Sequence, residues 1–228
     1  MKYIIIGLGN FGTSLGEKLT QIGHEVIGVD NRISKVEALK ERLTHTICLN
    51  CTDQQAVESL PLSNTDVVIV SIGEDEGANI ITTALLKQMK VKRLISRAIS
   101  PIHETILSAM GVEEILHPEE ETAARWAKKL TMTNVIDSFE LPDHYNIVEL
   151  MVPDKFIGRS LEEIGLLRHY GIIVLTTISN NDEKNLFGNI RKVSRVNGVA
   201  SSKTILKYDE IMVIFGNIKD IERFMKDI

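Results

Sequence analysis

Three glycines near the start of the chain follow the spacing Gly7-x-Gly9-x-x-Gly12, and a carboxylate stands at Asp30. Glycine at the first position permits a tight turn, and glycine at the second lets the backbone approach a phosphate. Gly12 lets the following helix pack close to its sheet, so that the N–H groups and the positive dipole end of that helix face an anion. A carboxylate at the position of Asp30 can accept hydrogen bonds from ribose hydroxyls. The spacing predicts a site for a nucleotide or a dinucleotide.

The segments around these glycines match the elements that such a site needs. An apolar strand over 3–6 leads into the glycines, a helical pattern covers 14–22, and a second strand over 26–29 ends at Asp30. A glycine-rich turn with a purely structural role is the alternative interpretation. The surrounding pattern of strand, helix and strand favours nucleotide binding.

Short β-branched runs alternate with helical patterns through residues 3–116. This alternation predicts an α/β fold, a Rossmann-like doubly wound parallel sheet of about six strands. Helix starts are indicated by Thr52-Asp53, by Asp75, and by Ser100 followed by Pro101. The expected strands are Tyr3–Ile6, Glu25–Val29, Thr46–Leu49, Val67–Ile72, Leu94–Ser96 and Glu114–Leu116.

After the sixth predicted strand, a helix begins at Pro118 with acidic residues in its first turn and continues through Leu130. Its apolar face includes Trp126 and needs a packing partner. A crossover onto a second copy of the chain would supply that partner. We divide the chain into a nucleotide-binding domain over 1–117, a crossover helix and linker over 118–140, and a small α+β domain over 141–228.

The pattern of the last third of the chain is typical of a small α+β domain. Ser160 is expected to cap a short helix that carries Leu161, Ile164 and Leu167. A polar turn or hairpin is expected at Ser179–Asn185. The other expected elements are the strands Val135–Leu141, Tyr145–Val152, Ile172–Ile178 and Ile211–Phe215 and a closing helix at Ile218–Met225.

The composition is that of an ordinary globular chain with a net charge of −5. The chain carries no excess of basic residues that would attract nucleic acid, so we expect no nucleic-acid partner. No apolar run approaches the roughly 20 residues that span a bilayer, and the N-terminus lacks the apolar region of a signal peptide. We therefore expect a cytoplasmic protein.

The two cysteines have the spacing Cys48-x-x-Cys51, which is also found in redox pairs and in halves of metal sites. Cys48 belongs to a predicted strand and Cys51 to the loop after it, which differs from a redox motif at a helix start. No second pair of cysteines or histidines completes a zinc site. We interpret both as ordinary cysteines.

Motifs along the whole chain resemble the regulatory subunits of bacterial potassium uptake systems of the Ktr and Trk type, which carry the domain called regulator of conductance of potassium (RCK). A single unit in 228 residues is similar to the Ktr regulator rather than to the Trk regulator, which has two units in tandem. The segments that carry the resemblance are Ile4–Gly12, Gly23–Val26, Val29–Asp30, Thr44–His45, Asn50–Asp53, Val68–Gly73, Gly111–Val112, His117–Glu119, Gly158–Leu161 and Tyr170–Ile172.

The resemblance implies a homodimer that assembles into a ring, commonly an octamer, docked on the inner face of the membrane under a potassium transporter subunit. Exchange of an adenine nucleotide (ADP or ATP, or NAD(H)) in the N-terminal domains would change the shape of the ring and gate the pore. Such gating requires that the ligands contact two ring conformations differently.

The resemblance also implies which residues form the site. The loop over 50–53 borders the adenine, residues 71–73 end the fourth strand at the switch point, and Arg97 lies near the phosphates. Asp53 has the alternative role of a helix cap, and Arg97 that of a surface salt bridge. The implied residues are Gly7, Gly9, Asn10, Phe11, Gly12, Asp30, Asn31, Asn50, Cys51, Thr52, Asp53, Ser71, Ile72, Gly73 and Arg97.

Position 10 departs from the family pattern, because many Ktr-type regulators have arginine where this chain has Asn10. Asparagine supplies no charge for a terminal phosphate, so ATP should be held less strongly than in those relatives. ADP, AMP and NAD(H) become more credible ligands.

Two further ligands are implied by the resemblance. Glu119 matches a glutamate that binds a divalent cation at the dimer interface, for which Mg²⁺ or Ca²⁺ suits an oxygen-only site. A carboxylate that favours the helix dipole is the alternative role for Glu119. Cyclic di-AMP binding is implied near Arg168 in the C-terminal domain, although Arg191–Lys207 diverges from the usual hairpin and Tyr208 replaces a glycine.

Two other functions remain open at this point. An NAD(P)-dependent oxidoreductase could share the glycine motif, but the second domain offers no Ser/Tyr/Lys arrangement, and His144 and His169 have no evident carboxylate partner for proton transfer. A free-standing nucleotide or redox sensor is the other alternative. We expect a regulatory protein without enzymatic activity.

Overall fold

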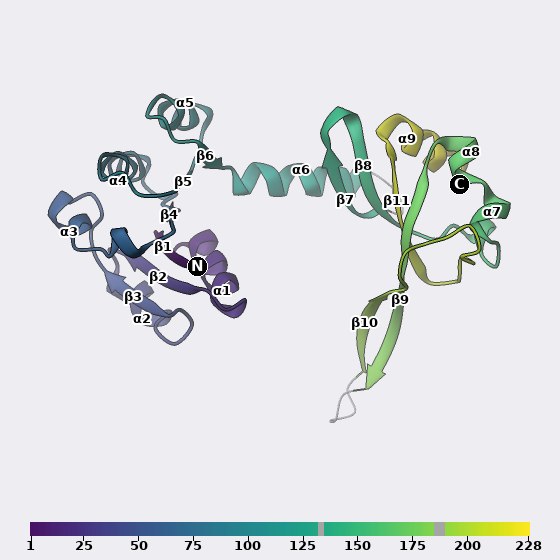
Figure 1. Cartoon of the computed structure of the whole chain (residues 1–228), viewed down its shortest axis with the longest axis horizontal. Coiled ribbons are helices and arrows are strands. Elements are labelled where there is room, and N and C mark those ends of the chain that lie inside the picture. Colours follow the sequence, from purple (N-terminus) through teal and green to yellow (C-terminus); the bar gives the residue numbers. More distant parts are fainter. Residues whose placement is uncertain (132–134, 185–189) are drawn as a thin grey trace. The chain divides into compact units, whose positions relative to one another are not determined.

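The computed structural model describes residues 1–131, 135–184 and 190–228. The chain divides into two compact units, Met1–Glu121 and Thr122–Ile228 (Figure 1). Within the described residues, no helix is both long enough and apolar enough to cross a membrane.

The first unit is built on a parallel six-stranded sheet with the order β3-β2-β1-β4-β5-β6. This order confirms the predicted doubly wound Rossmann-like fold. The chain reverses its direction of travel across the sheet between β1 and β4, which is the switch point where such sheets bind ligands. The strands are β1 (Lys2–Ile6), β2 (Glu25–Asp30), β3 (His45–Cys48), β4 (Val67–Val70), β5 (Leu94–Arg97) and β6 (Glu114–Leu116).

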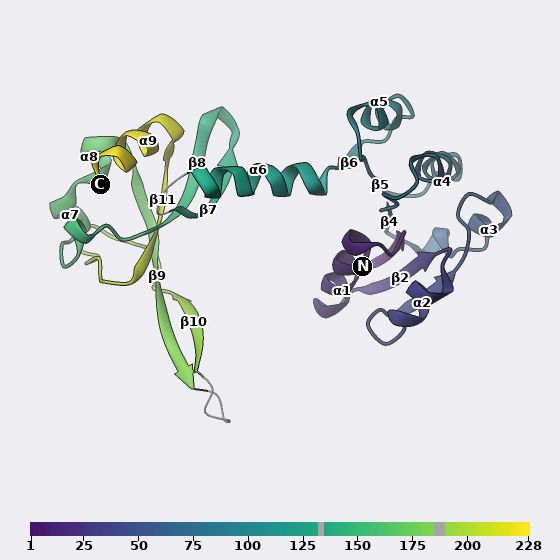
Figure 2. The same cartoon turned by 180° about the vertical axis from the view of Figure 1, so that it is seen from behind.

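Helices cover both faces of this sheet, because successive side chains of a strand point to opposite faces. Ile4 and Ile6 of β1 belong to one core cluster, whereas Ile5 belongs to another. The helices are α1 (Asn10–Gln21), α2 (Ile33–Ala38), α3 (Gln54–Glu58), α4 (Glu76–Gln88) and α5 (Pro101–Ala109), with a 3-10 turn η1 (Leu62–Asn64) (Figure 2).

Three predicted helix starts are confirmed by side-chain caps. Asp53 accepts hydrogen bonds from the backbone N–H groups that open α3, and Asp75 accepts one from Ala78 N at the start of α4. Ser100 accepts a hydrogen bond from His103 N at the start of α5. These caps satisfy backbone donors that have no partner inside the helix.

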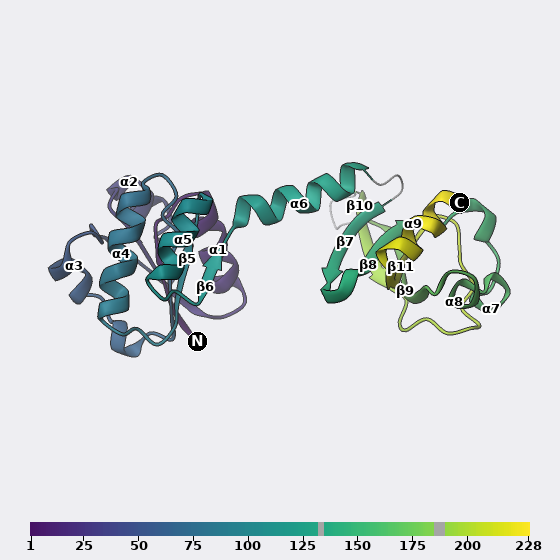
Figure 3. The same ribbon diagram turned by 90° about the horizontal axis from the view of Figure 1, so that it is seen from above.

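The predicted helix after the sixth strand is α6 (Pro118–Thr131) (Figure 3). Its first turn carries three acidic residues, which interact favourably with the helix dipole. Farther along, Trp126 is 51% exposed and Leu130 is 78% exposed.

The second unit contains an antiparallel five-stranded sheet with the order β10-β9-β11-β8-β7, which confirms the predicted α+β domain. Its core includes Leu150, Met212, Ile214 and Phe224. The elements are β7 (Val135–Leu141), η2 (Pro142–His144), β8 (Tyr145–Met151), η3 (Asp154–Phe156), α7 (Leu161–Ile164), α8 (Leu166–Tyr170), β9 (Ile173–Lys184), β10 (Ile190–Val196), β11 (Glu210–Asn217) and α9 (Ile218–Asp227).

Several boundaries differ from the sequence-based expectation. The hairpin expected at Ser179–Asn185 is present as the antiparallel pair of β9 and β10, but its polar residues as far as Lys184 belong to the strand β9 and not to the turn, because strand hydrogen bonds need no apolar side chains. Asn185 lies outside the described residues. The helix capped by Ser160 ends at Gly165, whose left-handed conformation starts a separate helix α8, so Leu167 belongs to α8. Strand β7 has the bounds that were predicted for it, Val135–Leu141, and pairs with β8.

Candidate functional site

A cavity of about 560 Å³ lies in the first unit and is lined by residues that follow β1, β2, β3 and β4. Its volume is in the range of small-molecule sites, and it lies at the switch point of the sheet. The structure therefore brings together segments that are far apart in the sequence. The predicted residues that line the cavity are Gly7, Gly9, Asn10, Phe11, Asp30, Asn31, Asn50, Cys51, Thr52, Ser71, Ile72, Gly73, Arg97 and Glu119.

The three glycines of the motif have different roles. Gly7 has a φ of +99°, and a Cβ there would lie 2.8 Å from Ile72 N. A Cβ on Gly12 would lie 2.5 Å from Ser71 Oγ and closer still to the carbonyl oxygen of Gly7, so Gly12 serves packing and does not line the cavity. A Cβ on Gly9 would meet nothing within 4 Å. The fold requires glycine at positions 7 and 12, but not at position 9.

The N-terminus of α1 opens on this cavity. Its N-cap residue is Gly9, no side chain caps the helix, and its first turn contains no acidic residue. Asn10 and Phe11 of the first turn line the cavity. A helix start with this chemistry favours an anion through its backbone N–H groups and its dipole.

Buried polar side chains hold the floor of the cavity in place. The Ser71 hydroxyl lies 2.7 Å from the carbonyl oxygen of Gly7 and 3.1 Å from that of Ile6. Asn79 on α4 donates hydrogen bonds to the carbonyl oxygens of Ile72 at 2.9 Å and Arg97 at 3.1 Å. These bonds tie the ends of β4 and β5 to the glycine turn and to α4.

Asp30 ends β2 with a buried side chain that already accepts two backbone hydrogen bonds. Its Oδ2 accepts one from Leu8 N at 2.8 Å, and its Oδ1 accepts one from Arg32 N at 2.9 Å. An ionised carboxylate has about four lone-pair sites, so acceptor capacity remains for a ribose. Ribose binding by Asp30 stays a prediction, and the structure adds a second role, anchoring of the glycine loop.

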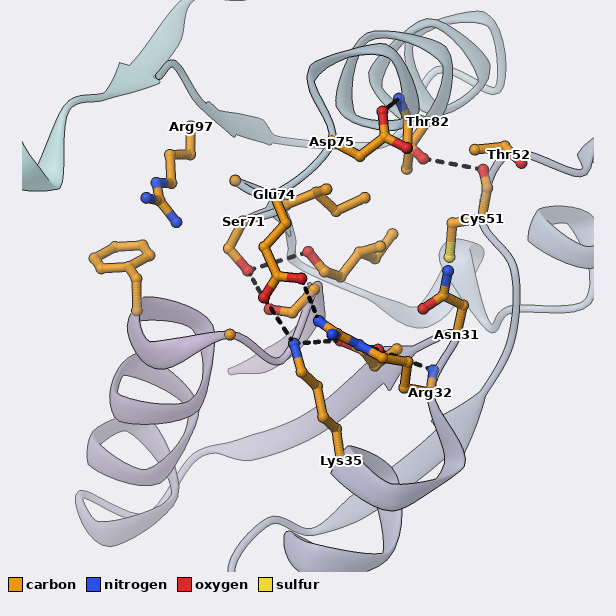
Figure 4. A pocket seen from close by; sticks show the side chains of 18 of the residues that line it. Asn31, Arg32, Lys35, Cys51, Thr52, Ser71, Glu74, Asp75, Thr82 and Arg97 are labelled. Carbon is orange, nitrogen blue, oxygen red and sulfur yellow. Dashed lines mark hydrogen bonds and ion pairs between the residues drawn. The ribbon is translucent and has the colours of Figure 1, made fainter. Parts of the chain in front are cut away.

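Arg32, Lys35 and Glu74 also line the cavity but were missed in the sequence (Figure 4). Arg32 Nε and Lys35 Nζ each lie 3.7 Å from a carboxylate oxygen of Asp30. Two basic residues within five positions after the predicted ribose carboxylate are the signal that could have found them. Glu74 has no comparable signal, because it approaches them from another loop.

The loop predicted to border an adenine is held by its own side chains. Asn50 Oδ1 accepts hydrogen bonds from Thr52 N at 3.1 Å and from the Thr52 hydroxyl at 2.9 Å. The Thr82 hydroxyl on α4 donates to the carbonyl oxygen of Cys51 at 3.1 Å. Asp53 caps α3 and does not line the cavity, so of its two predicted roles the structure shows the cap.

Cys48 and Cys51 are both free thiols in different surroundings. Burial, and to a lesser degree the charge of Asp30, raises the pKa of Cys51 to about 12. The thiolate is the reactive form, so Cys51 is protonated and unreactive at neutral pH. The burial of Cys51 supports its interpretation as an ordinary cysteine, and the same interpretation of Cys48 stays a prediction.

Arg97 forms an ion pair with Glu119, and its guanidinium packs against Gly73. Both partners line the cavity, so the salt-bridge role proposed for Arg97 is present beside the site itself. Over the described ranges, no group of three or more His, Cys, Asp or Glu side chains could hold a metal ion. Cation binding by Glu119 stays a prediction.

The strand order, the glycine turn and the cavity at the switch point together define a Rossmann-like nucleotide-binding domain followed by a small α+β domain. The TrkA-N domain family matches residues 3–118, which is half of the chain. Ktr system potassium uptake protein C of Bacillus subtilis (strain 168) is 30% identical over 227 residues, covering 100% of this chain and 97% of that protein. The corresponding protein A of the same organism is 31% identical over 223 residues, covering 98% of this chain and 95% of its own.

The chain therefore belongs to the TrkA-N family, with Ktr potassium uptake proteins among its relatives, and the predicted resemblance is confirmed. The crystal structure of the GsuK RCK domain has a TM-score of 0.66 at 16% identity, over 99% of this chain and 47% of that chain. The GsuK channel bound to NAD has a TM-score of 0.63 at 16% identity, over 96% of this chain and 38% of that chain. This chain spans less than half of either GsuK chain, and the likeness shows the fold.

Proposed function

We propose that this chain is the regulatory subunit of a Ktr-type potassium uptake system, in which an adenine nucleotide bound at the switch-point cavity controls a membrane transporter subunit. The near full-length likeness to Ktr system potassium uptake proteins A and C supports the link to potassium. The proposal that the chain binds an adenine nucleotide rests on the cavity at the switch point.

The observation that carries the proposal is the geometry at Gly9. Glycine there is not needed by the fold, since a Cβ would meet no atom of the protein within 4 Å. It lies at the uncapped start of α1, on the wall of the cavity. A residue without a side chain at this point leaves room for a phosphate to approach the helix N-terminus, while Asp30 offers an acceptor for ribose.

Several finer features belong to the same proposal. Asn10 lines the cavity without supplying a cation, which favours AMP, ADP or NAD(H) over ATP. Mg²⁺ or Ca²⁺ at Glu119 and cyclic di-AMP in the second unit extend the proposal to the ligands of the family. The protein acts on the cytoplasmic side of its transporter and has no enzymatic role.

Assembly is also proposed, as dimers that join into a ring, with an octamer as the expected stoichiometry. The exposed apolar side chains of Trp126 and Leu130 on α6 support burial against a second copy of the chain. Ligand binding then gates the transporter only if the nucleotide favours one ring conformation over another, with couplings of about 1–3 kcal/mol typical of such systems.

Two measurements test this function. Calorimetric titration of the purified chain with AMP, ADP, ATP, NAD⁺ and NADH should give saturable binding, with ATP weaker than ADP. Co-expression with a Ktr pore subunit in cells that lack their own potassium uptake should restore growth at low potassium, and a chain that binds no nucleotide should not. Absence of adenine nucleotide binding refutes the proposal, and oxidation of a hydroxy acid with NAD⁺ would favour the oxidoreductase.

A further inference from the structure

An ion-pair cluster spans the cavity beside the glycine turn. Glu74 comes from the loop after β4, whereas Arg32 and Lys35 follow β2, and β1 lies between these strands in the sheet. Glu74 Oε2 is 2.6 Å from Arg32 Nη2, and Glu74 Oε1 is 3.5 Å from Lys35 Nζ. Figure 4 shows the carboxylate of Glu74 directed at both cations across the cavity.

The same cluster lies next to the place where phosphates are expected. Lys35 and Glu74 together line a hollow with Gly9 and Asn10, at the start of α1. An anion at the N-terminus of α1 would therefore find two cations nearby, whose charge Asp30 and Glu74 together offset. Asn10 supplies no charge there, so Arg32 and Lys35 are the basic residues on this side of the turn.

The two carboxylates that face these cations are not equivalent. Asp30 has only 6% of its side chain exposed and is fixed by two backbone hydrogen bonds. Glu74 has 69% of its side chain exposed. The hydrogen bond from Arg32, followed by the charges of Lys35 and Arg32, holds the pKa of Glu74 below its usual range. Glu74 is thus ionised at neutral pH and is the partner that can move away.

We propose that Arg32 and Lys35 bind a phosphate of the nucleotide and that Glu74 competes with this phosphate for them. The inference rests on the proposed nucleotide function. A guanidinium presents paired donors that match carboxylate and phosphate alike, so a phosphate, which carries more charge, can replace the carboxylate. Adenosine alone cannot displace Glu74, and the cluster therefore makes binding depend on the ligand carrying a phosphate.

The phosphate that reaches these cations has two sources. It belongs either to the 5′ chain of AMP, ADP or ATP, or to the ribose, as in 2′-phosphorylated dinucleotides, where a basic residue near the end of the second strand receives it. Comparing ADP with NADP⁺ and NAD⁺ distinguishes these sources, since only NADP⁺ carries the ribose phosphate.

The test is the isosteric substitution Glu74→Gln, with Glu37→Gln as the matched control. Glu37 lies on α2 and pairs with Lys40, and it does not line the cavity. Exposed ion pairs contribute little, so we expect Glu74→Gln to bind ADP or NADP⁺ roughly two- to fivefold more tightly than the wild type. Binding of adenosine, measured by calorimetry, should not change, and Glu37→Gln should behave as the wild type.

Arg32→Gln supplies the opposite perturbation and should weaken binding of the same phosphate-bearing ligand roughly three- to tenfold. Raising the ionic strength from about 0.05 to 0.5 M should reduce both effects, because it shortens the screening length. Equal effects of Glu74→Gln on ADP, NADP⁺ and adenosine, or no effect on any of them, overturn the inference while nucleotide binding stands. Failure of the wild type to bind any adenine nucleotide overturns the proposed function as well.

Discussion

Gly9 and Gly12 offer a paired test of the site, because the fold needs glycine at only one of them. Gly9 has φ −78° and ψ −171°, a conformation open to any residue, and its Cβ would meet nothing within 4 Å. The Cβ of an alanine at position 12 would lie 2.5 Å from Ser71 Oγ and even closer to a backbone oxygen. The same substitution should therefore affect binding at one position and folding at the other.

The expected magnitudes follow from these contacts. Gly9→Ala lowers the entropy of the unfolded chain, which stabilises the folded protein by about 0.4–1 kcal/mol, but alanine is a poorer N-cap and destabilises it by a similar amount. The free energy of unfolding should therefore change by less than about 1 kcal/mol. Gly12→Ala cannot relieve its overlap by rotation, and we place its cost at about 3 kcal/mol, less about 1 kcal/mol for the helix propensity of alanine. The net loss is about 2 kcal/mol.

The ligand affinity should change in the opposite order. A methyl group on Gly9 projects into the cavity where a phosphate would approach the start of α1, so ADP binding should weaken at least tenfold, or by about 1.4 kcal/mol. Urea unfolding followed by circular dichroism gives the stabilities, and calorimetry gives the affinities. Unchanged ADP binding by a folded Gly9→Ala protein would falsify the phosphate position, and a Gly12→Ala protein as stable as the wild type would refute the packing argument.

Two further predictions concern buried groups. His103 is fully buried, and within the described residues neither ring nitrogen has a hydrogen-bond partner. Burial lowers the pKa of His103, and the charge of Glu76 raises this pKa by a smaller amount. The unfolded chain therefore takes up the proton more readily, so wild-type stability should fall as the pH drops below about 6.5, by up to about 1.4 kcal/mol per pH unit, and fall less in His103→Phe. Cys51, with a pKa of about 12, should resist an aromatic disulfide reagent at pH 8 that labels exposed Cys48, and rapid labelling of two thiols in the folded protein would contradict its burial.

Much of the first unit could be predicted because its signals are local. The glycine spacing, the run of apolar residues before Gly7 and the carboxylate at Asp30 all lie within one strand, helix and strand, so the pattern and the site coincide. Helix caps such as Asp75 and Ser100 are equally local, since each acts within three residues of its own position.

Contacts between loops could not be predicted in the same way. Arg32 and Glu74 are 42 residues apart, and their ion pair depends on β1 lying between the strands that carry them. Nothing in the spacing of either residue indicates the other. The doubly wound class of the sheet could be inferred from the sequence. Which side chains meet from loops of different strands could be seen only in the structure.

In the second unit, two elements have bounds that the sequence pattern does not predict. Polar residues from Ser179 to Lys184 are typical of a turn, yet they belong to a strand, which beyond Ser179 has β10 as its only neighbouring strand among the described residues. Without an apolar face to pack, such a strand has no alternation of apolar and polar residues to reveal it. The break at Gly165 was hidden for the opposite reason, because the apolar residues on both sides keep a helical spacing.

The hydrogen bond from Leu8 N to Asp30 has a consequence for how ligand binding can be dissected. The residue expected to recognise the sugar also fixes the loop expected to recognise the phosphate, so the two halves of a nucleotide are not recognised by independent parts. Truncating Asp30 removes a sugar acceptor and loosens the phosphate loop in a single step. The binding energies of nucleoside and phosphate fragments should therefore be non-additive, and a ligand that contacts both should gain more than the sum of its fragments.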